Sequence, residues 1–168
     1  LLLWLGLGLL LVALARPLST VAVPRLSSTL VLALDVSSSM VATDVQPDRL
    51  RAARLVAAEL IDAKPENVDI GLVTFGEGAL AAQLPTDDRE VLHRAVARAA
   101  AGGGTSLGEA IVASLGMIVG QHVTLPAPGD PLPPLGRWES ATIVLISDGE
   151  QTSAVDPLAA VDLAANAG

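Results

Sequence analysis

The chain alternates between continuous apolar runs and stretches in which apolar residues recur at helical spacing. The continuous runs, at Thr29–Leu34, Val68–Phe75 and Ala141–Ser147, are bounded by turn residues and are typical of buried parallel strands. A fourth run, Ala79–Leu84, is followed by Pro85 and indicates an edge strand, because proline has no N–H to donate to a sheet.

Helices are predicted between these strands. The first has Pro47 in its first turn and runs to about Ala63. Its apolar stripe comprises Leu50, Ala53, Leu55, Val56, Leu60 and Ile61. Thr86 and Asp87 are predicted to cap a second helix that ends near Ala100.

Two further helices are predicted in the second half of the chain. Ser106 and Glu109 have the spacing of a capping box and open a helix that runs to about Gly120. Asp156-Pro157 combines a capping residue with proline at the first helical position. Between these helices, Thr124–Gly136 contains five prolines, so an extended loop is expected there.

This order of elements predicts a doubly wound, mostly parallel open α/β sheet of the Rossmann-like kind, with helices on both faces. We assign residues 29–168 to this domain and residues 16–28 to a linker. Gly168 ends the chain where a further strand is expected, so the C-terminal strands of the sheet are expected to be missing.

The stretch Leu1–Ala15 is uncharged and rich in leucine. A helix needs roughly 20 apolar residues to cross a bilayer, so we interpret this stretch as part of a truncated transmembrane helix that ends at Arg16-Pro17. The alternative is a secretory signal peptide, because Ala13-Leu14-Ala15 fits a small-residue cleavage site. Either interpretation brings the chain to a membrane, and we expect the domain on its extracytoplasmic face.

Composition removes several classes of function. The formal net charge of −8 argues against a nucleic-acid partner, whose phosphates would be repelled. The chain has no cysteine, which excludes disulfides, thiolate metal sites and cysteine nucleophiles. Two tryptophans and one phenylalanine are the whole aromatic content, too little for a surface that stacks on bases.

Oxygen-bearing side chains gather where an open α/β sheet places its chemistry, at the carboxyl ends of strands. Asp35, Ser37 and Ser39 form a D-x-S-x-S sequence directly after the first strand, and Asp148 follows the Ala141–Ser147 strand. Thr105 lies in a glycine-rich loop expected at the same end. Two carboxylates and three hydroxyls suit a hard cation such as Mg²⁺, with Mn²⁺ or Ca²⁺ as alternatives, and suit Zn²⁺ poorly.

Two enzyme signatures compete with this metal-site hypothesis. Gly104-Thr105-Ser106-Leu107-Gly108 fits the G-x-S-x-G elbow of α/β-hydrolases, which makes a serine hydrolase with Ser106 as nucleophile the alternative function. That elbow must follow a strand, and the preceding residues have helical character. The sequence from Gly76 to Ala81 fits the dinucleotide pattern G-x-G-x-x-A, but Pro85 leaves too little room for the phosphate-binding helix.

The motifs D-V-S-S-S-M at 35–40, G-G-T at 103–105 and S-D-G at 147–149 resemble the metal ion-dependent adhesion site of von Willebrand factor type A domains. The sequences A-L-A-R-P at 13–17, A-T-D-V-Q-P-D-R-L at 42–50 and I-S-D-G-E at 146–150 resemble, more narrowly, the membrane-anchored bacterial Bat-type proteins of aerotolerance operons.

This resemblance implies a binding module and not an enzyme. Ser37, Ser39 and Thr105 would bind the metal directly, and Asp35 and Asp148 would bind it directly or through water. A protein partner would complete the coordination with an acidic side chain. The resemblance further implies a location at the bacterial cell membrane and a link to a MoxR-type AAA+ ATPase.

Overall fold

The computed structural model describes residues 4–6, 28–127 and 129–168. The predicted transmembrane segment and the linker therefore fall almost wholly outside the described residues. Within the described part of the chain, no helix combines the length and the apolar character that crossing a bilayer requires.

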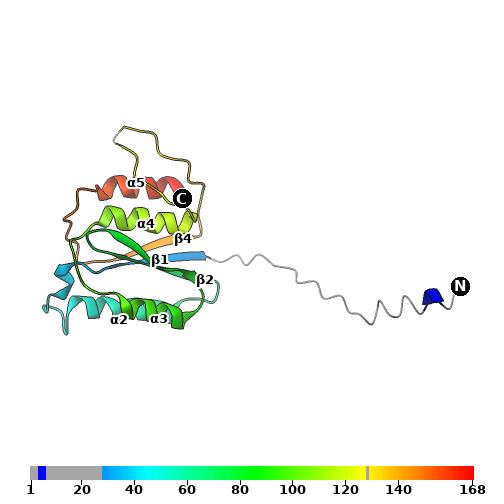
Figure 1. Ribbon diagram of the computed structural model, residues 1–168, viewed down its shortest axis with the longest axis horizontal. Helices are drawn as coiled ribbons and strands as arrows, with labels where there is room; N and C mark the ends of the chain where they lie inside the picture. Colours follow the sequence, from blue (N-terminus) through cyan, green and yellow to red (C-terminus); the bar gives the residue numbers. More distant parts are fainter. Residues whose placement is uncertain (1–3, 7–27, 128) are drawn as a thin grey trace.

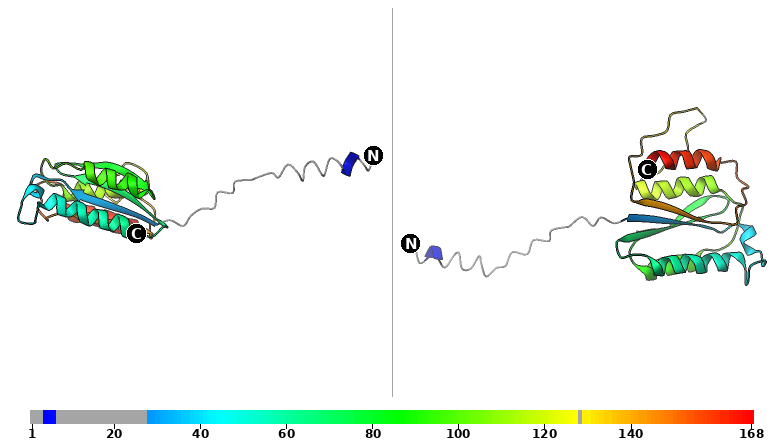
Figure 2. Two further views of the ribbon diagram at one scale, coloured as in Figure 1. Left: turned by 90° about the horizontal axis from the view of Figure 1, so that it is seen from below. Right: turned by 180° about the vertical axis from the view of Figure 1, so that it is seen from behind.

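A four-stranded sheet separates two layers of helices (Figure 1), and Figure 2 shows the same layers from two further sides. The strands are β1 (Ser28–Asp35), β2 (Val68–Phe75), β3 (Ala79–Thr86) and β4 (Ala141–Ile146). The helices are the 3₁₀ turn η1 (Ser38–Val41), α2 (Arg49–Ala63), α3 (Arg89–Arg98), α4 (Leu107–Val119) and α5 (Pro157–Ala167). Helices α2 and α3 lie on one side of the sheet, and α4 and α5 lie on the other.

The strand order is β3-β2-β1-β4. Strand β1 pairs in parallel with both β2 and β4, whereas β3 pairs antiparallel with β2 and forms one edge. The sheet is therefore mixed, with a parallel centre, and the predicted α/β class with helices on both faces is confirmed. Because β1 and β4 run in parallel, the loops that follow them leave the sheet at the same end.

Strand β1 is the centre of the core, and its side chains alternate between the two helical layers. Leu32 and Leu34 pack with α2 and α3, whereas Val31 and Ala33 pack with α4, and none of the four is exposed. A strand covered on both faces must be apolar at every position, which explains its continuous apolar run.

Helix α2 begins at Arg49, later than predicted. Asp48 is its N-cap and accepts a hydrogen bond from the Arg51 N–H at 2.7 Å, so Pro47 precedes the cap and does not lie in the first turn. The buried face of the helix consists of Leu50, Ala53, Ala57 and Ile61. The wider stripe predicted from the sequence was wrong, because Leu55, Val56 and Leu60 are exposed.

The next two helices also differ from the prediction at their ends. Asp88, and not Thr86 or Asp87, caps α3 by accepting from the Val91 N–H at 3.1 Å, and the helix ends at Arg98. Ser106 stands at the N-cap of α4, but its side chain makes no capping hydrogen bond. The C-cap Gly120 has φ +74°, a conformation that favours glycine and ends the helix as predicted.

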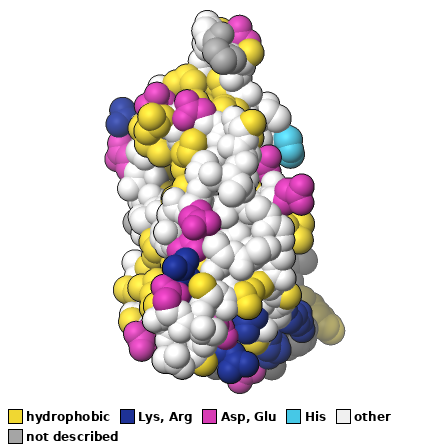
Figure 3. Space-filling model, turned by 90° about the vertical axis from the view of Figure 1, so that its left-hand side faces the viewer, with side chains coloured by type: hydrophobic (Ala, Val, Ile, Leu, Met, Phe, Trp, Pro, Cys, Tyr) yellow, Lys and Arg dark blue, Asp and Glu magenta, His cyan; other side chains and the backbone are white. Residues whose placement is uncertain are grey.

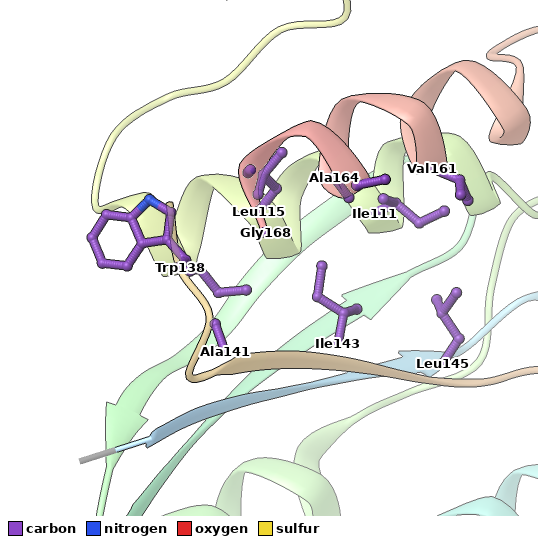
Figure 4. A pocket seen from close by; sticks show the side chains of 12 residues that line it. Ile111, Leu115, Trp138, Ala141, Ile143, Leu145, Val161, Ala164 and Gly168 are labelled. Atoms are coloured by element: carbon purple, nitrogen blue, oxygen red, sulfur yellow. The ribbon is translucent and has the colours of Figure 1, made fainter. Parts of the chain in front are cut away.

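Both outer strands differ from their predictions as well. Strand β3 is an edge strand as expected, but it continues through Pro85 to Thr86. Strand β4 was predicted to be buried, yet it is the other outer strand of the described sheet, and Leu145 is 41% exposed. An apolar cavity of about 290 Å³ lies between β4, α4 and α5 (Figure 4).

Helix α5 is capped by Asp156 and has Pro157 in its first turn, as predicted. The proline-rich connection from α4 to β4 contains no helix or strand among its described residues. Its C-terminal part is held against α5, because the Trp138 N–H donates to the Ala167 carbonyl at 2.8 Å and Leu135 packs against Leu163.

A pair of substitutions on α2 tests which face of the helix carries stability. Ile61→Ala should lower the free energy of unfolding by about 2–5 kcal/mol, because Ile61 is fully buried and its loss leaves a cavity. Leu55→Ala should change it by less than about 0.5 kcal/mol, because Leu55 is 63% exposed. Urea denaturation of both variants measures the difference, and equal losses would contradict this arrangement of the helix.

Candidate metal centre

The candidate site lies at the carboxyl ends of β1 and β4. Asp35 is the last residue of β1, and Asp148 follows the end of β4 by two residues. The two strands are in register up to Leu34 and Ile146, so the loops that follow them start side by side. Figure 3 views this end of the molecule, where acidic and basic side chains lie close together among uncharged surface.

Asp35 is fully buried, and both of its carboxylate oxygens accept hydrogen bonds. Oδ1 accepts from the Ser37 N–H at 2.8 Å, and Oδ2 accepts from the Ser147 hydroxyl at 2.6 Å. Ser147 thus connects the end of β4 to the end of β1. Sequence reasoning did not assign Ser147 to the site, because its role depends on a partner 112 residues away.

Ser37 and Ser39 follow Asp35 in the tight turn that leads into η1. Their hydroxyl oxygens lie 2.9 Å apart and share a hydrogen bond, and Ser37 is almost completely buried. The Ser39 hydroxyl also lies beside the carboxylate of Asp148 and lowers its pKa. The two serines therefore join the carboxylates of both strands into one polar group.

The glycine-rich loop is pinned to this turn by backbone hydrogen bonds. The N–H and the hydroxyl of Ser38 both donate to the Gly103 carbonyl, at 3.0 and 2.9 Å, and the Gly102 N–H donates to the Val36 carbonyl at 2.6 Å. Gly103 has φ +82°, and a Cβ there would lie 3.1 Å from Glu77. The close approach of the loop thus needs glycine at this position.

Thr105 is buried directly beyond that loop, and the loop after β4 holds its backbone. Its N–H donates to the Thr152 Oγ1 at 2.7 Å, and its carbonyl accepts from the N–H groups of Thr152 and Ser153 at 3.0 and 3.1 Å. A Cβ on Gly104 would lie 2.6 Å from the same Thr152 Oγ1. Sequence reasoning missed Thr152, since a lone threonine in a loop carries no signal of its own.

Asp148 is paired with Arg49, the first residue of α2. Arg49 Nη1 lies 2.6 Å from Asp148 Oδ2, while Arg49 Nε and Nη2 lie 2.8 and 2.9 Å from the two carboxylate oxygens of Asp44. Burial raises the pKa of Asp148, but hydrogen bonds from Ser39, the Glu150 N–H and Arg49 outweigh it and hold this pKa below its usual value. The hydrogen bonds of Arg49 likewise lower the pKa of Asp44.

The structure thus brings Asp35, Ser37, Ser39 and Asp148 into one polar group, and it buries Thr105 at the loop that adjoins them. The five side chains offer oxygen alone, which fits a hard divalent cation. No cluster of three or more His, Cys, Asp or Glu side chains with a metal-binding arrangement occurs among the described residues, and the candidate site itself contains two carboxylates and three hydroxyls.

The geometry does not support either competing enzyme signature. Ser106 follows helix α3 and a loop, where a nucleophile elbow requires a strand, and the Ser106 hydroxyl is fully buried away from any substrate. His93 pairs with Asp62 at 2.8 Å on the α2–α3 side of the sheet. Gly76 and Gly78 form the tight turn between β2 and β3, so no helix follows them to bind a phosphate.

Comparisons with known proteins agree with this fold. Residues 30–151 match the family model described as the von Willebrand factor type A domain. A UPF0353 protein of Nocardia farcinica is 39% identical over 147 residues, and one of Mycobacterium ulcerans is 35% identical over 162 residues. These alignments cover 88% and 93% of this chain, but only 42% and 44% of the relatives, so the chain spans less than half of their length.

Two solved structures from Bacteroides show the same likeness. One is an aerotolerance-related membrane protein of Bacteroides fragilis and the other is BatB of Bacteroides thetaiotaomicron. Each has a TM-score of 0.63 and 27% sequence identity, and the match covers 83% or 84% of this chain and 63% of the other.

The family model covers most of the chain, and the two structural neighbours share its fold. The chain therefore belongs to the von Willebrand factor type A domain family and is similar to the Bat-type membrane proteins of aerotolerance systems.

Proposed function

We propose that this domain is a protein-interaction module that binds its partner through a divalent cation. The observation that carries the proposal is the gathering of two carboxylates and a pair of hydroxyls, with a buried threonine beside them, where three loops meet. The ligands would be the side chains of Asp35, Ser37, Ser39, Thr105 and Asp148. Mg²⁺ is the proposed ion, and Mn²⁺ or Ca²⁺ would be alternatives with the same preference for oxygen.

The ion would supply a positive charge that an acidic side chain of the partner can bind. Asp35 and Asp148 together balance the charge of one dication, and hard cations take six or more oxygen ligands, so a further carboxylate from outside can be accommodated. The hydrogen bonds that already hold Asp35 orient it before any ion arrives, which reduces the reorganisation needed for binding.

Binding is favoured over catalysis because the described residues around the site lack a group suited to activate water. His93 is engaged with Asp62 on another face, and Glu150 is exposed beyond Asp148. Neither the geometry nor the family likeness favours hydrolysis by Ser106.

We also propose that the module works at a bacterial membrane, on its extracytoplasmic face, in a system with a MoxR-type AAA+ ATPase. The support is the uncharged N-terminal stretch of the sequence and the likeness to the membrane protein of Bacteroides fragilis.

Metal binding can be tested by thermal unfolding. Mg²⁺ should stabilise the wild-type domain in a concentration-dependent way, by about 2.7 kcal/mol at a free concentration 100 times Kd, because the ion binds the native state alone. Asp35→Asn keeps the size of the side chain but removes its charge, and it should abolish the shift in Tm. A full response to Mg²⁺ in this variant would remove Asp35 from the site.

Two neighbouring residues separate metal binding from hydrolysis. Thr105→Val keeps the shape of the side chain and should lose most of the Mg²⁺-dependent shift in Tm. Ser106→Ala removes a buried hydroxyl that has no hydrogen-bond partner, so it should leave both stability and metal affinity within about 1 kcal/mol of the wild type. An esterase activity that disappears in Ser106→Ala would instead establish the hydrolase.

Partner binding should follow the metal. In pull-downs from detergent-solubilised membranes, proteins retained by the wild type in Mg²⁺ should be released by a chelator and should not be retained by Thr105→Val. Ser106→Ala serves as the matched control and should retain them. Retention that survives both the chelator and Thr105→Val would place recognition elsewhere on the domain.

A further inference from the structure

Arg49 is a basic side chain in direct contact with the candidate metal site. Its guanidinium lies between two carboxylates, with Nη1 on Asp148 Oδ2 at 2.6 Å and with Nε and Nη2 on the two oxygens of Asp44 at 2.8 and 2.9 Å. The pKa of Arg49 is raised above its usual value by these carboxylates, with Asp44 first, so the side chain stays charged.

The charged side chain of Arg49, paired with Asp148, opposes the binding of a metal cation at the same carboxylate. Asp148 has one negative charge, and Arg49 already neutralises part of it through a short, charge-assisted hydrogen bond. Repulsion between the guanidinium and a bound dication would weaken cation binding further. Solvent screens this repulsion little, because the Asp148 side chain is only 8% exposed.

The orientation of Asp148 does not depend on Arg49 alone. The Glu150 N–H donates to Asp148 Oδ1 at 3.3 Å, and the Ser39 hydroxyl lies beside the carboxylate. Removal of the guanidinium should therefore leave the carboxylate close to its present position, with its full negative charge.

Asp44 draws Arg49 in the other direction. It receives two of the three hydrogen bonds that the guanidinium makes to carboxylates, and its side chain is 55% exposed in the loop before α2. When Asp44 binds Arg49 more strongly, Arg49 competes less with a cation for the carboxylate of Asp148. When Asp44 binds Arg49 more weakly, this competition increases.

We infer that Arg49 is a counter-ion shared between Asp44 and Asp148, and that its position sets the affinity of the site for a divalent cation. This inference rests on the proposed function. It makes Asp44 a regulatory residue outside the ligand set, because a basic group from a partner that engages Asp44 would release Arg49 toward Asp148 and weaken metal binding. By linkage, a bound cation would favour the contact between Arg49 and Asp44 to the same extent.

Isothermal titration with Mg²⁺ at low ionic strength tests the inference on four variants of the whole chain. Arg49→Gln should bind Mg²⁺ at least about fivefold more tightly than the wild type, the lower end of typical coupling between sites. Asp44→Asn should bind it more weakly by a similar factor. The double variant should behave like Arg49→Gln, because Asp44 acts only through the arginine.

Arg51→Gln is the matched control. Arg51 is two residues along the same helix, is 66% exposed and pairs with Asp48, so this variant makes the same change in net charge away from the site. Its Mg²⁺ affinity should stay within about twofold of the wild type, because charges separated by solvent are screened.

Weaker or unchanged Mg²⁺ binding in Arg49→Gln would overturn the inference, as would equal tightening in Arg51→Gln or an effect of Asp44→Asn that persists without Arg49. If Arg49→Gln does not fold, Asp44→Asn decides alone, and an affinity equal to that of the wild type rejects the inference. A folded wild-type chain that binds no Mg²⁺ would overturn the proposed function itself, whereas wild-type binding without these differences rejects the role of Arg49 alone.

Discussion

The carboxylate of Asp35 is buried at the end of the central strand, and a buried carboxylate destabilises a fold unless hydrogen-bond donors surround it. The Ser37 N–H and the Ser147 hydroxyl supply those donors. The first requires a tight turn directly after β1, and the second requires β4 to lie beside β1 in parallel. Satisfying one side chain thus constrains the turn, the strand order and the register.

Hydrogen bonds also connect the other loops at this end of the sheet to one another. Ser38 fastens the glycine-rich loop to the turn after β1, and Thr152 fastens the backbone of Thr105 to the loop after β4. Backbone and hydroxyl groups make most of these contacts, and Met40 of η1 packs into the hydrophobic core beneath them. The neighbouring oxygens of Ser37 and Ser39 lie beside both carboxylates, and oxygen is the donor atom that hard cations prefer.

Charge is distributed unevenly around this site. The chain is acidic as a whole, yet Arg49 stands against one of the two carboxylates of the candidate centre. Two uncompensated carboxylates would attract a cation more strongly than a carboxylate pair with a guanidinium beside it. The contact with Arg49 reduces the negative charge at Asp148. Arg49 also pairs with Asp44, which is exposed at the surface of the domain.

The sequence by itself determined the elements whose signal is local. The continuous apolar run of β1 indicated a strand covered on both faces, and the oxygen-bearing residues after β1 and β4 followed from their places at strand ends. The family likeness rested on the same short motifs. Helix boundaries were predicted less well, because the neighbours Asp87 and Asp88 have the same capping chemistry, and it is Asp88 that caps α3.

Only the tertiary structure decided which residues support the site. Arg49 and Asp148 are 99 residues apart, and Thr105 and Thr152 are 47 apart, so neither pair leaves a pattern in a sequence window. The exposure of Leu55 on α2 and of Leu145 on β4 depends in the same way on what other elements cover. The spacing of apolar residues indicates whether a segment forms a helix or a strand. Which side chains are buried or paired depends on the elements that pack together after folding.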